Sequence, residues 1–169
     1  MTREPHGELA RLLPRLVAFA RTMLGEQEAA RDLVQEAAAR ALGARQVPAD
    51  APAYRAWMFQ IVRNAALDEL KRRRRLTAAA LPEAHVDLWS YDAARIAKLT
   101  VEQGLAALEP PHREIIALID IAGFSYAEAA GLTGVPIGTV MSRVARARSA
   151  LLAAIEQSSV RPLRSRHGG

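Results

Sequence analysis

The sequence predicts an all-α protein with two small helical domains joined by a flexible linker. Of its 169 residues, 50% are hydrophobic and only 5% are aromatic. The abundant alanine and leucine favour helices over strands. Apolar residues recur at three- and four-residue steps along many segments, as on the buried face of a helix. A stretch without this periodicity separates two groups of such segments, and no segment has a convincing strand pattern.

Missing residue types and patterns exclude whole kinds of site. The chain has no cysteine, which excludes disulfides and thiolate metal sites. Its histidines lie far apart, without the spacing of metal ligands, at His6, His85, His112 and His167. We therefore expect no metal and no cofactor. No apolar run approaches the length of a membrane span, and the N-terminus lacks the form of a signal peptide. The sequence thus predicts a soluble, cytoplasmic protein without membrane insertion.

The first domain is predicted to cover residues 1–75 and to contain three helices. The apolar pattern places them at about residues 7–24, 28–42 and 53–75. Pro14 lies within the first of them, which predicts a kink or a later helix start. Opposite its apolar stripe, the second helix carries a polar side formed by Asp32, Gln35, Glu36 and Arg40. Three helices of this kind can form one bundle around a shared core.

The third predicted helix ends in five consecutive cations, from Lys71 to Arg75. One interpretation of this run is purely structural. The cations would lie at the solvent-exposed C-terminal end of the helix, where they interact favourably with the helix macrodipole. Acids one turn earlier support it, because Asp68 can pair with Arg72, and Glu69 with Arg73. Runs of charged residues in proteins are often no more than solvent-exposed helix ends of this kind.

The alternative interpretation of these cations is a nucleic-acid surface. So dense a cluster repels itself unless it binds an anion. Arg63, Lys71 and Arg74 fall on one face of the helix, with Asn64 nearby. We favour this interpretation. Trp57 could stack on an unpaired base, but its place in the apolar stripe favours a core position.

Residues 76–92 are predicted to form the flexible linker between the domains. They contain no lysine or arginine, and their acids are Glu83, Asp87 and Asp92. A proline interrupts their weak periodicity, as expected for a linker. At the other end of the chain, residues 158–169 are basic and lack a core pattern, which predicts a disordered tail.

Residues 93–157 are predicted to form the second helical domain. One helix is expected at about residues 96–108. Pro110 and Pro111 then break the chain and suit the first turn of a second helix, which Gly123 ends.

The same domain is predicted to contain a helix-turn-helix. Ser125 suits an N-cap and Glu128 follows three residues later, as in a capping box. Gly134 suits the left-handed conformation that turns the chain sharply. The inward positions of the helix that follows are Val140, Val144 and Ala147. Tight turns with glycine also occur in ordinary helical bundles, so this pattern alone does not decide between a bundle and a DNA-binding unit.

The charge pattern favours DNA binding by this unit. The net charge is +5, and beyond Gly138 a single acid, Glu156, opposes six arginines. The outward positions near the start of the second helix, where a recognition helix reaches base edges, are Met141, Ser142, Ala145 and Arg146. Arg143 and Arg148 flank them and suit phosphates.

Three segments of the chain carry a wider pattern: RDLVQEAAARAL, AWMFQIVRNAALDELKRRRR and LEPPHREIIALIDIAGFSYAEAAGLTGVPIGTVMSRVARARSALL. In order and spacing they resemble bacterial sigma factors of the extracytoplasmic-function (ECF) group, over about residues 8–157. The resemblance implies a sigma-two domain followed by a sigma-four domain. It implies a promoter-specificity subunit that binds RNA polymerase core, recognises a two-part promoter and assists strand opening. An anti-sigma factor is a further implied partner.

The resemblance also implies roles for individual residues. The segment that docks on the clamp helices of the polymerase largest subunit corresponds to Asp32, Gln35, Glu36 and Arg40. The segment that meets the minus-ten element of promoter DNA corresponds to Arg63, Asn64, Asp68, Lys71, Arg72, Arg74 and Arg75. The recognition helix for the minus-thirty-five element corresponds to Thr139, Met141, Ser142, Arg143, Ala145, Arg146 and Arg148.

Two other classes of protein compete with this hypothesis. A helix-turn-helix regulator that binds DNA without polymerase core would need a dimerisation element, and the sequence has no spare one. An enzyme would need a catalytic constellation, but the sequence has no nucleophile elbow, phosphate loop or convincing carboxylate pair. We therefore expect no enzymatic activity and no small-molecule substrate.

Overall fold

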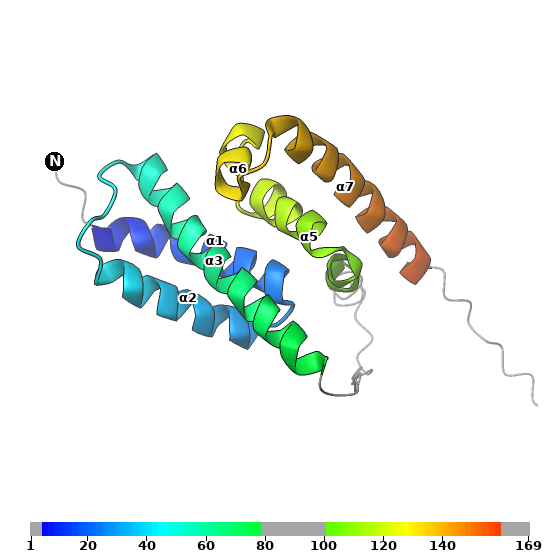
Figure 1. The fold of residues 1–169 in the computed structure, drawn as a ribbon, viewed down its shortest axis with the longest axis horizontal. Coiled ribbons are helices and arrows are strands. Elements are labelled where there is room, and N and C mark those ends of the chain that lie inside the picture. Colours follow the sequence, from blue (N-terminus) through cyan, green and yellow to red (C-terminus); the bar gives the residue numbers. More distant parts are fainter. Residues whose placement is uncertain (1–4, 79–100, 160–169) are drawn as a thin grey trace, which may run out of the picture.

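The computed structural model describes residues 5–78 and 101–159, and within these stretches helices are joined by turns and short loops (Figure 1). The first domain contains α1 (Pro5–Leu24), α2 (Gln27–Leu42) and α3 (Ala51–Thr77). The second contains a helical segment at residues 101–107, α5 (Pro110–Ile116), the π-helix η1 (Ala117–Ile121), α6 (Tyr126–Thr133) and α7 (Ile137–Ser159). The predicted all-α class is confirmed, with no strand in either described stretch.

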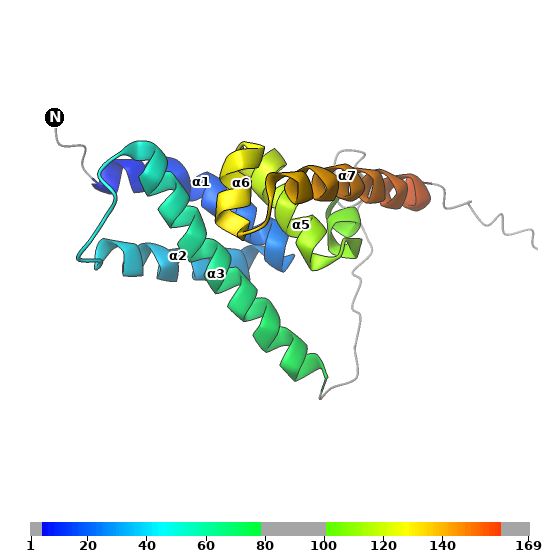
Figure 2. The same cartoon turned by 45° about the horizontal axis from the view of Figure 1, so that its top comes forward.

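Local sequence signals position the helices of the first domain. Gly25, with φ of +80°, ends α1 in a conformation that favours glycine. Asp50 caps α3, because its carboxylate accepts a hydrogen bond of 2.8 Å from the backbone N–H of Ala53. Helices α1 and α2 lie side by side and α3 crosses them (Figures 1 and 2). Their buried faces meet around Phe19 and Phe59, whose rings pack edge to face with 5.5 Å between the ring centroids.

The predicted helix-turn-helix is confirmed in its local details. Ser125 Oγ accepts a hydrogen bond from the N–H of Glu128 at 3.2 Å, and the Glu128 carboxylate accepts one from the N–H of Ser125 at 2.7 Å. This is the reciprocal capping box that the sequence predicts. Gly134 has φ of +69° and ends α6 in the left-handed conformation. The inward positions of α7 are buried as expected, at Val140, Val144 and Ala147.

The structure differs from the sequence prediction at some element boundaries. Helix α1 begins at Pro5 and includes Pro14, so the later start is wrong. Helix α3 continues to Thr77 and takes in the first residues of the predicted linker. The rest of that linker, residues 79–92, and the tail beyond Ser159 lie outside the described residues.

The sequence did not predict the π-helix that follows α5. Its wider turn is marked by the hydrogen bond from the Ala122 N–H to the Ala117 carbonyl at 2.8 Å, which spans five residues. The segment ends at Gly123, as predicted, with φ of +75°.

The two domains pack directly against each other. Their buried side chains form one continuous core. Phe124 of the second domain packs edge to face on Phe59 of α3, with 4.9 Å between ring centroids. The sequence did not predict this contact, because it joins side chains from opposite sides of the linker.

Candidate nucleic-acid and polymerase interfaces

The start of α7 presents an exposed side at the predicted recognition surface. Met141 is 53% exposed, and Ser142, Ala145 and Arg146 are exposed beside it. Ser142 Oγ donates to the Thr139 carbonyl at 3.0 Å, which leaves the lone pairs of its oxygen for a donor. A cluster of this kind, with a small, a hydroxylated, a thioether and a guanidinium side chain, can fit a groove of DNA.

Two flanking arginines of α7 have different surroundings. Arg148 is held by Asp120 of η1, with Nη2 at 2.7 Å from Oδ1 and Nε at 3.3 Å from Oδ2. The hydrogen bond with Asp120 raises the pKa of Arg148 above its ordinary value. Its side chain stays 52% exposed, so it keeps access to a phosphate. Arg143 is half-buried, whereas Arg146 is exposed, and no described residue hydrogen-bonds to Arg146.

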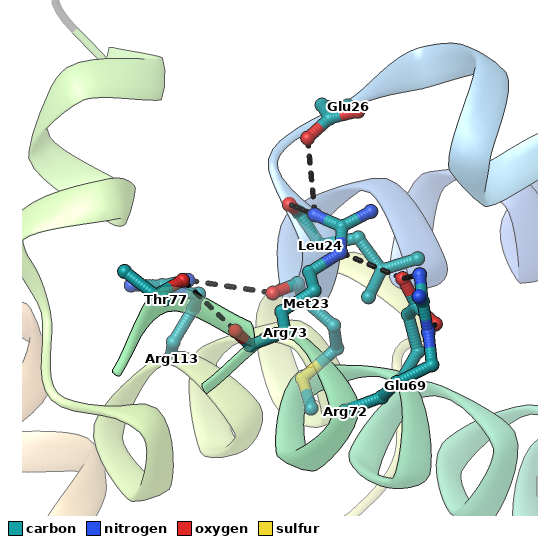
Figure 3. A network of polar contacts seen from close by, with 8 residues as sticks. All are labelled: Met23, Leu24, Glu26, Glu69, Arg72, Arg73, Thr77 and Arg113. Atoms are coloured by element: carbon teal, nitrogen blue, oxygen red, sulfur yellow. Dashed lines mark hydrogen bonds and ion pairs between the residues drawn. The ribbon is translucent and has the colours of Figure 1, made fainter. Parts of the chain in front are cut away.

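The basic end of α3 divides into two kinds of cation. Lys71, Arg72, Arg74 and Arg75 are exposed, whereas Arg73 is only 28% exposed. Arg73 Nη1 donates to the Leu24 carbonyl at 3.1 Å and pairs with Glu26 at 3.0 Å. It therefore caps the C-terminal end of α1. Figure 3 shows this network, with Arg113 of the second domain donating to the neighbouring Met23 carbonyl at 3.3 Å.

The ion pairs at this end partly follow the spacing predicted from the sequence. Glu69 pairs with Arg73 at 2.8 Å, as predicted. Arg72 also pairs with Glu69, at 2.8 Å, rather than with Asp68. Asp68 lies 3.8 Å from Lys71 instead. Hydrogen bonds from Arg72 and Arg73 lower the pKa of Glu69 to about 2. The interpretation as a helix end held by local ion pairs therefore describes Arg72 and Arg73.

Arg63 and Asn64 lie in different environments although they are neighbours. Asn64 is exposed and its side-chain oxygen accepts a hydrogen bond from Gln60 at 3.0 Å. Arg63 is only 15% exposed, because its Nε pairs with Glu114 of the second domain. In this arrangement Arg63 does not share an exposed face with Lys71 and Arg74. No local pattern could predict this pairing, since Glu114 is 51 residues away in the chain.

The polar side of α2 is exposed, as the sequence predicted. The exposed side chains are Asp32, Gln35, Glu36 and Arg40. Glu36 and Arg40 form an ion pair one turn apart. A groove of 590 Å³ lies between α2 and α3, and its walls include Asp32, Glu36 and Arg40 together with Asp68, Glu69, Arg72 and Arg75. Three of the predicted polymerase-binding residues therefore line the same groove as three of the predicted minus-ten residues, Asp68, Arg72 and Arg75.

Metal-binding clusters and membrane spans are two further features that the described stretches could contain. Residues 5–78 and 101–159 contain no group of three or more histidine, aspartate and glutamate side chains that could hold a metal ion. None of their helices has the length and apolar character of a membrane span.

A basic three-helix domain packed on a helix-turn-helix domain defines a class of DNA-binding transcription factor, and two family profiles match it. Residues 9–76 match the profile described as Sigma-70 region 2. Residues 98–151 match the one described as Sigma-70, region 4. The two matches fall in this order on the two domains, which favours a sigma factor over a helix-turn-helix regulator that works without polymerase core.

Individual relatives agree with these profiles. The chain is 37% identical over 145 residues to a probable RNA polymerase sigma-C factor of Mycobacterium bovis, covering 84% of this chain and 76% of the relative. It is also 37% identical over 147 residues to the ECF RNA polymerase sigma factor EcfG of Rhodopseudomonas palustris, covering 83% and 79%. The chain belongs to the ECF sigma factors. It is a promoter-specificity subunit of RNA polymerase and not an enzyme.

Solved structures show the same fold. The sigma factor RpoE, in its complex with the anti-sigma factor NepR from Bartonella quintana, is 30% identical and matches with a TM-score of 0.71, over 89% of this chain and 96% of that one. CnrH, in complex with the cytosolic domain of CnrY, is 28% identical and matches with a TM-score of 0.64, over 90% and 88%.

Proposed function

We propose that the two domains of this sigma factor read the two parts of a promoter, with residues 1–75 at the minus-ten element and 93–157 at the minus-thirty-five element. The observation that carries this proposal is the exposed start of α7, where Arg146 is held by no described residue and Met141, Ser142 and Ala145 lie beside it. Arg146 offers the forked donor that suits guanine, and Arg143 and Arg148 suit the adjacent phosphates.

The minus-ten side of the proposal rests on the end of α3. Lys71, Arg72, Arg74 and Arg75 are exposed there and concentrate positive charge on one end of a long helix. Asn64 and Asp68 are exposed on the same helix and can hydrogen-bond to bases or phosphates. Such a surface suits a separated DNA strand.

Polymerase binding is assigned to the polar side of α2. Asp32, Gln35, Glu36 and Arg40 form a mixed, exposed surface that is not needed for the core of the first domain. Charged side chains in this position suit docking on the clamp helices of the polymerase largest subunit. The polymerase then fixes the spacing of the two DNA-binding surfaces and raises their effective concentration.

The regulatory partner is proposed to be an anti-sigma factor. Two of the similar solved structures are described as complexes, RpoE with the anti-sigma factor NepR and CnrH with the cytosolic domain of CnrY. The cytoplasm, where RNA polymerase works, is the proposed place of action.

Run-off transcription tests the proposal. Polymerase core with and without the purified chain is supplied with a pool of fragments from the source genome, and the 5′ ends of the transcripts are sequenced. Start sites that depend on the chain and share two sequence elements at one fixed spacing support the proposal. Start sites that share only one element would contradict a two-part reader.

A further inference from the structure

Two large apolar side chains are exposed one turn apart at the start of α7. Ile137, the first residue of the helix, is 49% exposed, and Met141 is 53% exposed. Ala145 is exposed at the next position of the same spacing. Residues four apart lie on one side of a helix, so Ile137, Met141 and Ala145 form an apolar stripe. The sequence pattern did not include Ile137 among the DNA-binding residues.

The fold of the chain does not use this apolar stripe. Val140 and Ala147 are buried on the inward side of α7, so the stripe lies outside the core. The first turn is closed, because the N–H groups of Thr139 and Val140 donate to the Pro136 carbonyl at 2.9 and 3.1 Å. Ile137 is therefore exposed from a regular helical turn. Single apolar side chains are common on protein surfaces, but this stripe begins where a recognition helix contacts base edges.

The charges around the apolar stripe indicate what it contacts. The sequence has no acid between Glu128 and Glu156, whereas the same stretch contains Arg143, Arg146 and Arg148. An apolar protein surface would leave these cations without counter-charges. Duplex DNA offers phosphates beside a groove in which some base edges are apolar. The surroundings of the stripe therefore fit DNA.

Gly138 lies next to Ile137 and leaves this surface open. Its φ is not positive, and a Cβ added there would meet nothing within 4 Å. Neither backbone conformation nor packing among the described residues explains a glycine in the first turn of a helix, where alanine is more favourable. Close approach of a DNA backbone does explain it, because the DNA would meet the added methyl group.

We propose that Ile137, together with Met141, reads thymine in the minus-thirty-five element by contact with its methyl group. The inference rests on the proposed function of the second domain and adds Ile137 to its base-reading residues. Thymine is the base that presents a methyl group in the major groove, and apolar side chains recognise it there. Removal of both apolar surfaces from water favours the contact. Arg146 then reads guanine, and the apolar stripe beside it reads thymine.

Replacement of thymine by uracil tests the proposal, because uracil pairs in the same way and lacks only the methyl group. The probe is a promoter duplex whose run-off transcript depends on the chain, with uracil at one thymine of the upstream element at a time. Holoenzyme affinity is measured by competition fluorescence anisotropy. The unsubstituted chain should bind at least one uracil duplex about 4-fold more weakly, the loss expected for one buried methyl group.

The same duplexes with Ile137→Ala decide whether Ile137 makes the contact. Thymine and uracil at that position should then be bound equally. Comparison of the two chains on the same duplexes cancels any effect of uracil on the DNA itself. Ile137 is exposed and alanine favours helices, so the variant should keep its helix content by circular dichroism.

Leu152→Ala is the matched control. Leu152 is 58% exposed on α7, but it lies about 22 Å further along the helix, beyond the residues that reach base edges. This variant should keep the full preference for thymine. Three results would overturn the proposal: equal binding of thymine and uracil by the unsubstituted chain, a preference that survives in Ile137→Ala, or an upstream element without A·T pairs. If no transcript depends on the chain, the proposed function itself fails, which is a separate result.

Discussion

At the residue scale, Arg73 and Arg74 are neighbours in one run of cations, but their surroundings differ. Arg73 donates to the Leu24 carbonyl and pairs with Glu26 and Glu69, whereas Arg74 is exposed. A charged hydrogen bond to a half-buried carbonyl stabilises the fold more than an exposed cation does. The two residues therefore form a matched pair for testing which cations serve the fold and which serve DNA.

Arg73→Ala should lower the free energy of unfolding by about 1–2 kcal/mol, because the Leu24 carbonyl and Glu26 lose their partner. Arg74→Ala should change it by less than about 0.5 kcal/mol. Urea unfolding measures both. Binding of the holoenzyme to promoter DNA should become less dependent on salt in Arg74→Ala. The slope of log affinity against log salt concentration should fall in magnitude by about 1, as expected for the loss of one phosphate contact. The reverse pattern of effects would show that Arg73 is the DNA contact.

Arg146 provides the test of base readout on α7. Arg146→Ala should weaken holoenzyme binding to a minus-thirty-five element by about 1–3 kcal/mol, as expected for loss of a bidentate contact to a base. Arg146→Lys is the control, because it keeps the charge but loses the forked geometry. Fluorescence anisotropy on specific and unrelated DNA measures both effects. If lysine restores the affinity fully, Arg146 contacts only phosphate.

At the scale of elements, the turn between α6 and α7 positions the proposed recognition surface. Gly134 has φ of +69°, and a Cβ added there would meet nothing within 4 Å, so only the backbone conformation requires glycine. Gly131 lies inside α6, equally free of steric neighbours. The two glycines differ in backbone conformation and not in packing, so their alanine variants isolate the cost of the left-handed conformation.

Gly134→Ala should destabilise the chain by about 1–2 kcal/mol, because the left-handed conformation is unfavourable for alanine. Gly131→Ala should stabilise it by about 0.5–1 kcal/mol, because alanine is the better residue within a helix. Thermal and urea unfolding of both variants measure the difference. Equal effects of the same sign would mean that backbone conformation is not what Gly134 supplies.

Features set by adjacent residues were predictable from the sequence, whereas contacts between distant residues were not. The capping box of Ser125 and Glu128 and the turn at Gly134 depend on a few adjacent residues, so the sequence predicted them. The pairing of Arg63 with Glu114 and the capping of Leu24 by Arg73 join residues 51 and 49 positions apart. No periodicity carries such information. The exposed sides of α2 and α7 were predictable because helical spacing alone sets them.

At the scale of the whole molecule, the shared core makes the stability of one domain depend on the other. Phe124 packs on Phe59 and under Arg55 across the boundary, whereas Val140 is buried inside the second domain. Domains that share a core unfold together when the free energy of their contact is large relative to the stability of each. Urea unfolding with one probe in each domain therefore measures how strongly they are coupled.

The two probes should report a single coincident transition. Trp57 reports on the first domain once Trp89, the only other tryptophan, is replaced by phenylalanine, and a fluorophore on Ala150→Cys reports on α7. Phe124→Ala, which removes about 3–5 kcal/mol of packing at the boundary, should separate the transitions, with α7 unfolding at lower urea. Val140→Ala is the control, because it should lower both midpoints together. Separate transitions in the unsubstituted chain would mean that the boundary contributes little free energy to the stability of either domain.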